Sequence, residues 1–235
     1  MRLGIPLQPT SWRALDALWA MLLAVGIAYA IAALLLIAVL SLSSPWFLAT
    51  VAAPWLALGG WPLWVTRRRG NGAAIDLGLR LQVPDLLRGL AGGAAVFAAG
   101  LVAGLVTVQI SGDFSSAAAD EAQNIADTGG LPFLVLLALM VAVGAPFAEE
   151  LTFRGLLWSG LAKRGARPWI AVAVSAVAFA VMHFEPQRLL VLVTIGAGLG
   201  IVRWRTGSLG ACIVAHAVNN LPGAIGILLL ASGTG

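Results

Sequence analysis

Long stretches of the chain carry no charged side chain, and each predicts one or more membrane-spanning helices. The hydrocarbon core of a bilayer is roughly 30 Å thick, so a helix needs about 20 apolar residues to cross it. Between Asp16 and Arg67 lies a run of 50 residues without a charge, long enough for two spans with a turn at 41–45. We expect the first two spans at 17–41 and 45–66, the first being too long for a cleavable signal peptide.

Polar segments and apolar runs alternate through the rest of the chain. Three arginines at 67–69 end the second span, and 70–88 is typical of a loop or an interfacial amphipathic segment. Residues 111–130 contain four acidic residues and no basic one, which predicts a polar loop outside the bilayer. The pattern predicts further spans at 89–110, 131–158, 168–184, 189–202 and 206–235, the last broken near Pro222. The total is about seven, and six or eight also fit.

The composition excludes a soluble globular protein. Hydrophobic residues make up 60% of the chain and charged residues 10%, whereas about 45–50% and about 25% are usual for soluble domains. So few charges cannot cover a soluble fold with polar surface. We expect an all-α fold, a polytopic membrane helix bundle that forms a single integral membrane domain over 1–235. The one cysteine, Cys212, excludes an internal disulfide.

Basic residues lie almost entirely on one side of the predicted spans. If the N-terminus is cytoplasmic, the basic residues at 67–69, 163–167 and 203–205 are cytoplasmic too, as the positive-inside rule requires, and Arg188 is the exception. The formal charge of +4 therefore indicates orientation in the bilayer rather than a nucleic-acid partner. Arginine outnumbers lysine 13 to 1, which fits a GC-rich genome. We expect a multi-pass protein of a bacterial inner membrane.

A few ionisable or amide side chains lie inside the predicted spans. A charge there costs roughly 2.5 to 3.5 kcal/mol on insertion scales, so such residues indicate function by default. Three separate spans contribute them, and one shared site can therefore form between the helices. The set is Glu149, Glu150, Arg154, His183, His216, Asn219 and Asn220.

The two adjacent glutamates have different local partners. Glu150 precedes Arg154 by four positions, which places both on one helix face and favours a structural ion pair. Glu149 lies about 100° away around the helix and has no local cation, so it is the candidate general base. Direct catalysis by Glu150 is the alternative.

His216 and Asn220 also lie four positions apart, so one helix face presents an imidazole and an amide. Such a pair can hold a water molecule or donate hydrogen bonds to an oxyanion. The alternative is an interhelical hydrogen bond that only holds the bundle together, and this reading suits Asn219 better. Taken alone, His183 is more typical of a histidine at the bilayer surface, because Glu185 follows closely.

Together these residues resemble the motifs of the CAAX-protease and bacteriocin-processing family, also called CPBP or Abi, whose members are intramembrane endopeptidases. The motifs occur in family order at 149–154 (E-E-x-x-x-R), 179–183 (F-x-x-x-H) and 216–220 (H-x-x-x-N). The resemblance covers about 130–225, which we expect to be the catalytic core.

The resemblance implies a role for each motif residue. Glu149 and His183 would activate the water that attacks the scissile carbonyl, and His216 with Asn220 would stabilise the oxyanion. This agrees with the reading from the residues, since amide hydrolysis needs a base and preorganised donors. The supporting residues would be Glu150, Arg154 and Phe179.

Metal dependence is open at this point, because the family is also described as metalloproteases. A zinc ion would be held by His183, His216 and either Glu149 or Glu150, since two histidines and a carboxylate can form a catalytic site. The sequence has no H-E-x-x-H motif, and asparagine is an uncommon zinc ligand. We favour the glutamate mechanism and assign no cofactor, with zinc as the alternative.

The predicted function is cleavage of a membrane-anchored protein or peptide at the lipid bilayer. Its main competitor is a noncatalytic membrane scaffold or bacteriocin-immunity protein, in which the polar residues serve packing or partner binding. A small transporter or proton relay ranks third, because the sequence shows no inverted pair of broken hydrophobic segments. The sequence leaves the oligomeric state open.

Overall fold

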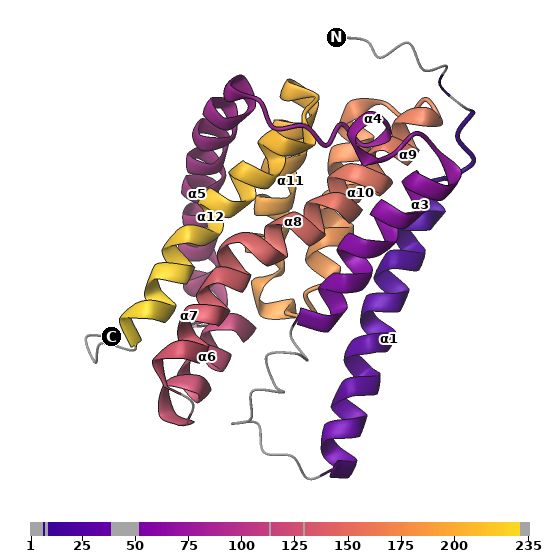
Figure 1. Ribbon diagram of the computed structural model, residues 1–235. Helices are drawn as coiled ribbons and strands as arrows, with labels where there is room; N and C mark the ends of the chain where they lie inside the picture. Colours follow the sequence, from indigo (N-terminus) through magenta and orange to yellow (C-terminus); the bar gives the residue numbers. More distant parts are fainter. Residues whose placement is uncertain (1–6, 8, 39–51, 113, 129, 231–235) are drawn as a thin grey trace.

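The computed structural model describes residues 7, 9–38, 52–112, 114–128 and 130–230. Every regular element within these residues is a helix, and the helices pack into one bundle (Figure 1). The protein is therefore an all-α, multi-pass membrane protein, as its apolar runs predict.

The long helices run alternately in opposite directions along the bundle (Figure 1). A single helical run from 131 to 163 contains two wide π-helical turns, η2 and η3. In chain order the elements are α1 (Leu15–Ala38), η1 (Leu56–Gly60), α3 (Trp61–Arg69), α4 (Ala73–Asp76), α5 (Val83–Ser111), α6 (Ala117–Thr128), α7 (Leu131–Leu139), η2 (Met140–Gly144), α8 (Ala145–Glu150), η3 (Leu151–Leu157), α9 (Trp158–Lys163), α10 (Pro168–Val181), η4 (Pro186–Arg188), α11 (Leu189–Thr206) and α12 (Leu209–Leu230).

Five helical stretches in the described part of the chain are long and apolar enough to cross a membrane. They correspond to the first, third, fourth, sixth and seventh predicted spans: Leu15–Leu34, Val83–Ser111, Leu131–Lys163, Pro186–Thr206 and Leu209–Leu230. The fifth predicted span is α10, a shorter apolar helix. The second, 45–66, lies partly outside the described residues, and its described part is helical from residue 52 onward.

The predicted loop at 111–130 is wrong in one respect, because it contains helix α6. The three alanines at 117–119 favour a helix, and Asp120 in the first turn suits the positive end of the helix dipole. Ala122 and Ile125 are buried in an apolar cluster with residues of α7 and α12. A short helix with a narrow apolar face has the average polarity of a loop, which is why the sequence pattern missed it.

The break expected near Pro222 is also wrong. Helix α12 continues through Pro222 to Leu230. A proline removes one backbone hydrogen bond, but membrane helices tolerate this loss where neighbouring groups compensate for it. His216 and Asn220 therefore project from one continuous helix.

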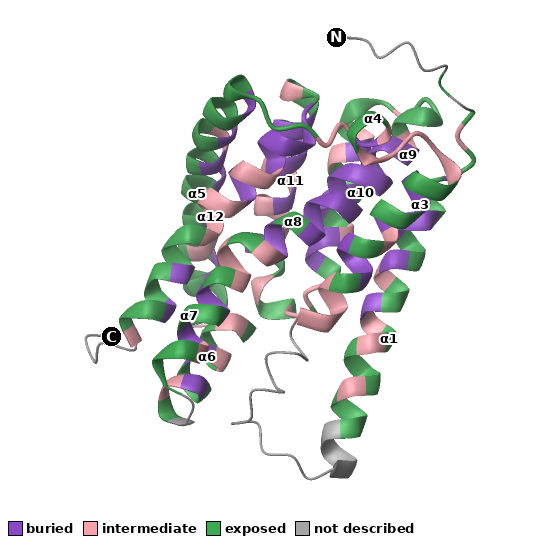
Figure 2. Cartoon of the chain, viewed as in Figure 1, coloured by how far each residue is buried: buried purple, intermediate pink, exposed green. Residues whose placement is uncertain are grey.

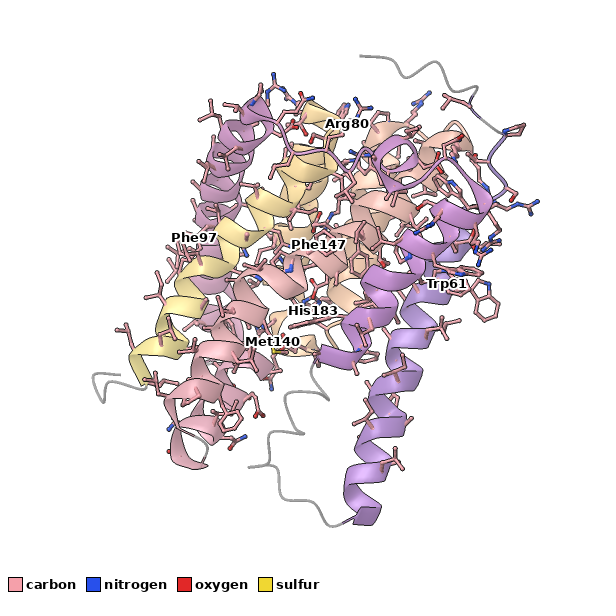
Figure 3. All side chains as sticks on the ribbon, viewed as in Figure 1. Trp61, Arg80, Phe97, Met140, Phe147 and His183 are labelled. Atoms are coloured by element: carbon pink, nitrogen blue, oxygen red, sulfur yellow. The ribbon has the colours of Figure 1, made fainter. Side chains whose placement is uncertain are left out.

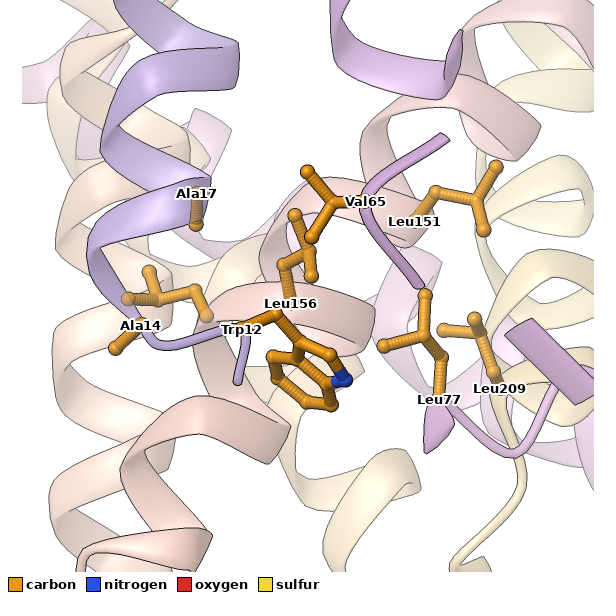
Figure 4. Packing of buried hydrophobic residues seen from close by; sticks show 9 residues of the cluster. Trp12, Ala14, Ala17, Val65, Leu77, Leu151, Leu156 and Leu209 are labelled. Carbon is orange, nitrogen blue, oxygen red and sulfur yellow. The ribbon is translucent and has the colours of Figure 1, made fainter. Parts of the chain in front are cut away.

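Apolar clusters anchor the two ends of the bundle, and buried residues concentrate along the facing sides of the central helices (Figure 2). Near the N-terminal end, Trp12, Leu77, Leu156 and Leu209 bring together four distant parts of the chain (Figure 4). The indole nitrogen of Trp12 also donates a hydrogen bond to Oδ2 of Asp76 at 2.9 Å. At the opposite end, a second cluster joins α6, α7 and α12.

Glycines let α12 and α11 approach their neighbours closely. A Cβ atom on Gly93 of α5 would lie 2.6 Å from the carbonyl oxygen of Ala215 in α12. A Cβ atom on Gly196 of α11 would lie 2.9 Å from Cα of Ala176 in α10. Both distances are shorter than van der Waals contact, so only glycine fits these seams. The contact at Gly93 sets how closely α12, the helix that carries His216, packs against α5.

Candidate active site

A cavity of about 960 Å³ lies between the helices, and most of its lining residues are apolar. The four residues with predicted catalytic roles line it, Glu149 from α8, His183 after α10, and His216 and Asn220 from α12, and Asn219 lines it as well. Figure 3 shows His183 in the interior of the bundle. The structure therefore brings these four side chains to one surface, although 71 positions separate Glu149 from Asn220 in the sequence.

Arg154 forms a buried ion pair with Glu150, as the four-residue spacing predicts. Its Nη1 donates to Oε1 of Glu150 at 2.6 Å, and both side chains are fully buried. Its Nη2 donates to the carbonyl oxygen of Gly196 in α11 at 2.7 Å. The guanidinium also lies over the ring of Phe179 in α10, with Cζ 4.9 Å from the ring centroid. Arg154 thus connects the motif helix to α10 and α11, and neither it nor Glu150 lines the cavity.

Glu150 also orients His216. Its Oε1 lies 3.0 Å from Nδ1 of His216, so the oxygen that accepts from Arg154 accepts from the imidazole as well. A carboxylate oxygen is only an acceptor, which means that Nδ1 carries the proton. Nε2 of His216 then faces Glu149, whose Oε2 lies 3.9 Å away. One glutamate holds the ring while the other faces it across the cavity.

The tautomer of His183 is fixed in the same way. Its Nδ1 lies 2.7 Å from the carbonyl oxygen of Phe179, which can only accept a hydrogen bond. Nδ1 therefore donates, and the lone pair of the neutral ring is on Nε2. The ring of Phe179 packs against both histidines, with centroid distances of 4.6 Å to His183 and 5.6 Å to His216. Phe179 thus supports the site through its backbone and its ring.

Pro146 explains how Asn220 is held. In the wide turn η2 the hydrogen bonds run from residue i+5 to residue i, as from Ala145 N to Met140 O. The next such bond would need an N–H at position 146, which proline lacks. The carbonyl oxygen of Val141 instead accepts a hydrogen bond from Nδ2 of Asn220 at 3.0 Å. Oδ1 of Asn220 accepts from Asn219, so the amide orientation is defined.

The cavity is also lined by residues that the sequence motifs do not indicate. Helix α6 lines the far side of the cavity through Ala117, Ala122 and Gln123. Glu185 and Arg188 line it as well and form an ion pair with each other. No motif indicates α6. The only sequence signal for the other two is their position a few residues after His183.

A catalytic zinc site has a ligand set that can be compared with the described residues. Such a site takes three protein ligands about 2.0 to 2.2 Å from the metal. Within the described ranges, no three His, Cys, Asp or Glu side chains are grouped so that they could hold a metal ion. We therefore derive no reaction step through zinc.

Comparison with known proteins finds similarity at the level of a protein family. No curated protein and no solved structure shows a significant match to the chain. A family model does, and its description is Type II CAAX prenyl endopeptidase Rce1-like. The match spans residues 131–222 and so includes the three motifs and every residue of the cluster described above. Residues 131–222 are thus similar to the Rce1-like CAAX endopeptidases, the family that the motifs resemble, and this similarity supports an intramembrane endopeptidase in general.

Proposed function

We propose that the protein hydrolyses a peptide bond of a membrane-anchored protein or peptide by a glutamate mechanism. One observation carries this proposal: Glu149, His183, His216 and Asn220 share one cavity. A polar cluster that served packing alone would pair its groups within the protein, as Oε1 of Glu150 pairs with Nη1 of Arg154, and would leave no lined space beside them.

Glu149 and His183 supply the base. A water molecule between these residues donates one hydrogen bond to the carboxylate of Glu149 and another to Nε2 of His183. Its lone pair then points away from both acceptors. As this oxygen bonds to the scissile carbonyl carbon, Glu149 takes the proton, and the carbonyl π electrons move to the carbonyl oxygen. The Nδ1–H···O=C bond to Phe179 keeps Nε2 available for this role.

His216 and Asn220 supply hydrogen bonds to the oxyanion. Nδ2 of Asn220 has two N–H groups, and one of them is used by Val141. His216 donates from Nε2 when it is an imidazolium, because both ring nitrogens then carry a proton. When the tetrahedral intermediate collapses, the C–N bond breaks, and the leaving amine takes the proton that Glu149 received.

The mostly apolar lining indicates a substrate segment that reaches the site from the bilayer. Ala24 of α1 and Leu101 of α5 line the cavity together with the polar cluster. An apolar peptide segment loses little hydration there, whereas the scissile amide meets the polar groups. We further propose a bacterial inner membrane with the N-terminus in the cytoplasm, because α3, α9 and α11 each have basic residues in their last turn and end near the N-terminal end of the bundle (Figure 1).

The test is peptidase activity of purified protein in proteoliposomes on a library of membrane-anchored peptides. We expect wild type to cleave at least one peptide and Glu149→Gln to lose that activity by several orders of magnitude. Asp120→Asn, which neutralises an exposed acid on α6, is the matched control and retains activity. Each protein is first checked for the same size-exclusion profile and melting temperature.

Each assay is repeated with a zinc chelator. Activity that survives the chelator and is lost in Glu149→Gln supports the glutamate mechanism. Loss of activity with the chelator, restored by added zinc, contradicts it in favour of the zinc alternative. Folded wild type that cleaves no peptide in the library favours the scaffold function over the endopeptidase.

A further inference from the structure

The segment that follows His183 has a strained backbone. Phe184 has a φ of 55°, the one positive φ of a non-glycine residue in the part of the chain that the structure describes. The left-handed region is unfavourable for an L-residue with a Cβ atom, and such conformations persist only where their surroundings hold them. Phe184 itself is 64% exposed, so packing of its own ring does not hold this conformation.

The next residue, Glu185, makes the contacts that hold the turn. Its Oε1 accepts a hydrogen bond from the backbone N–H of Ala117 at 2.7 Å, and its Oε2 pairs with Arg188. Ala117 is the first residue of α6, where backbone N–H groups lack partners within the helix and negative charge is favourable. Glu185 therefore ties the turn after His183 to a helix that lies 68 positions earlier in the sequence.

Helix α6 has two functions at this point of the fold. One side packs on α7 and α12 through Ala122 and Ile125. The helix also lines the cavity, with Ala117, Ala122 and Gln123 among the lining residues. The same carboxylate thus determines where α6 covers the cavity and where the backbone leaves His183.

We propose that Glu185 is a positioning residue for the reaction: it holds the Phe184 turn in its strained conformation and thereby orients His183. This proposal rests on the function proposed above, in which Nε2 of His183 contacts the attacking water. Glu185 itself does not contact the reacting atoms. Without its hydrogen bond to Ala117, the Phe184 turn relaxes toward a negative φ and the imidazole moves with it.

The experiment measures kcat and KM of Glu185→Ala, Glu185→Gln and the control Asp120→Asn in proteoliposomes. A displacement of about 1 Å at a catalytic group can cost on the order of 100-fold in rate, and we expect a fall in kcat of roughly 10- to 100-fold for Glu185→Ala. Glu185→Gln keeps an oxygen that can accept from Ala117 and should retain more of kcat. Unchanged kcat in correctly folded Glu185→Ala overturns the proposal.

A second variant separates positioning from a general loss of structure. Phe184→Gly removes the cost of the positive φ, because glycine adopts this conformation freely. Added to Glu185→Ala, it should restore part of kcat while KM rises, since the Phe184 ring lines the cavity. A double variant with kcat no higher than that of Glu185→Ala alone contradicts the proposed role.

Hydrogen exchange provides a readout that does not depend on catalysis. We expect faster exchange of the first amides of α6 in Glu185→Ala, with unchanged exchange in α10 and α12. Unchanged exchange at Ala117 overturns the proposal even if activity falls. If Glu149→Gln proves fully active, the proposed function fails, whereas the exchange result still shows whether Glu185 holds α6.

Discussion

Oε1 of Glu150 lies 3.0 Å from Nδ1 of His216, which joins the first motif to the third across the interior of the bundle. Since the same oxygen accepts from Arg154, the charge of Glu150 is shared between a permanent cation and a histidine. Glu150 is thus the link between the structural ion pair and the cavity. The adjacent Glu149 faces the same imidazole from the cavity side.

Neutralising each glutamate in turn should separate stability from activity. Glu150→Gln leaves the buried Arg154 without a charged partner, and breaking a buried pair costs about 3 to 5 kcal/mol. We expect a clear fall in melting temperature together with loss of activity. Glu149→Gln should lose activity and keep the melting temperature of wild type, because Glu149 has no ion pair with arginine or lysine among the described residues. Thermal unfolding in detergent measures both, and equal melting temperatures would contradict the assignment.

A methyl group at Gly93 should disturb the site from a distance. The added Cβ would lie 2.6 Å from the carbonyl oxygen of Ala215, so α5 and α12 must separate and His216 must move with its helix. Overpacking typically costs about 1 to 3 kcal/mol. Gly26→Ala on the exposed face of α1, where a Cβ would meet nothing within 4 Å, is the control and should be neutral or stabilising. Equal melting temperatures and activities for the two variants would show that the seam is not tight.

The stability of α6 should depend on pH through Glu121. Burial raises the pKa of this carboxyl above its ordinary value, and a hydrogen bond with Asn124 opposes the shift. A folded-state pKa above the unfolded one means that the folded state binds more protons, so stability falls as pH rises from the ordinary carboxyl range through the raised pKa. Glu121→Gln should remove this dependence. Limited proteolysis of α6 between acidic and neutral pH measures it, and the same pH profile in both proteins would contradict the shift.

Cysteine labelling can test the orientation. Cys212 is buried, so it gives little background, and new cysteines can replace the exposed residues Asp120 and Arg164. We expect a membrane-impermeant maleimide added to intact cells to label a cysteine at position 120 and to spare one at 164. The reverse pattern would place the N-terminus outside and contradict the orientation given by the basic residues.

The contacts within single helices could be predicted from the sequence, whereas the contacts between helices could not. The spacing of Glu150 and Arg154 defines their pairing, because four residues make about one helical turn. The hydrogen bonds from Asn220 to Val141 and from His216 to Glu150 depend on how separate helices pack, which no local pattern encodes. Helix α6 was missed for a related reason: its apolar face becomes recognisable only when α7 and α12 are present to cover it.

Two π-helical turns, η2 and η3, flank α8 in the helical run from 131 to 163. The directions of the side chains in this run therefore depend on the helical phase that these turns set. Each wide turn accommodates about one residue more than an α-helical turn, which offsets the helix downstream by roughly 100°. If η2 closed as an ordinary α-helix with all its residues kept, the residues that follow would rotate by this angle. The carboxylates of Glu149 and Glu150 would then lose their assigned directions without any change in their identity. Glu149 faces the cavity and Glu150 faces Arg154 because of the register of the helix as well as the identity of the residues.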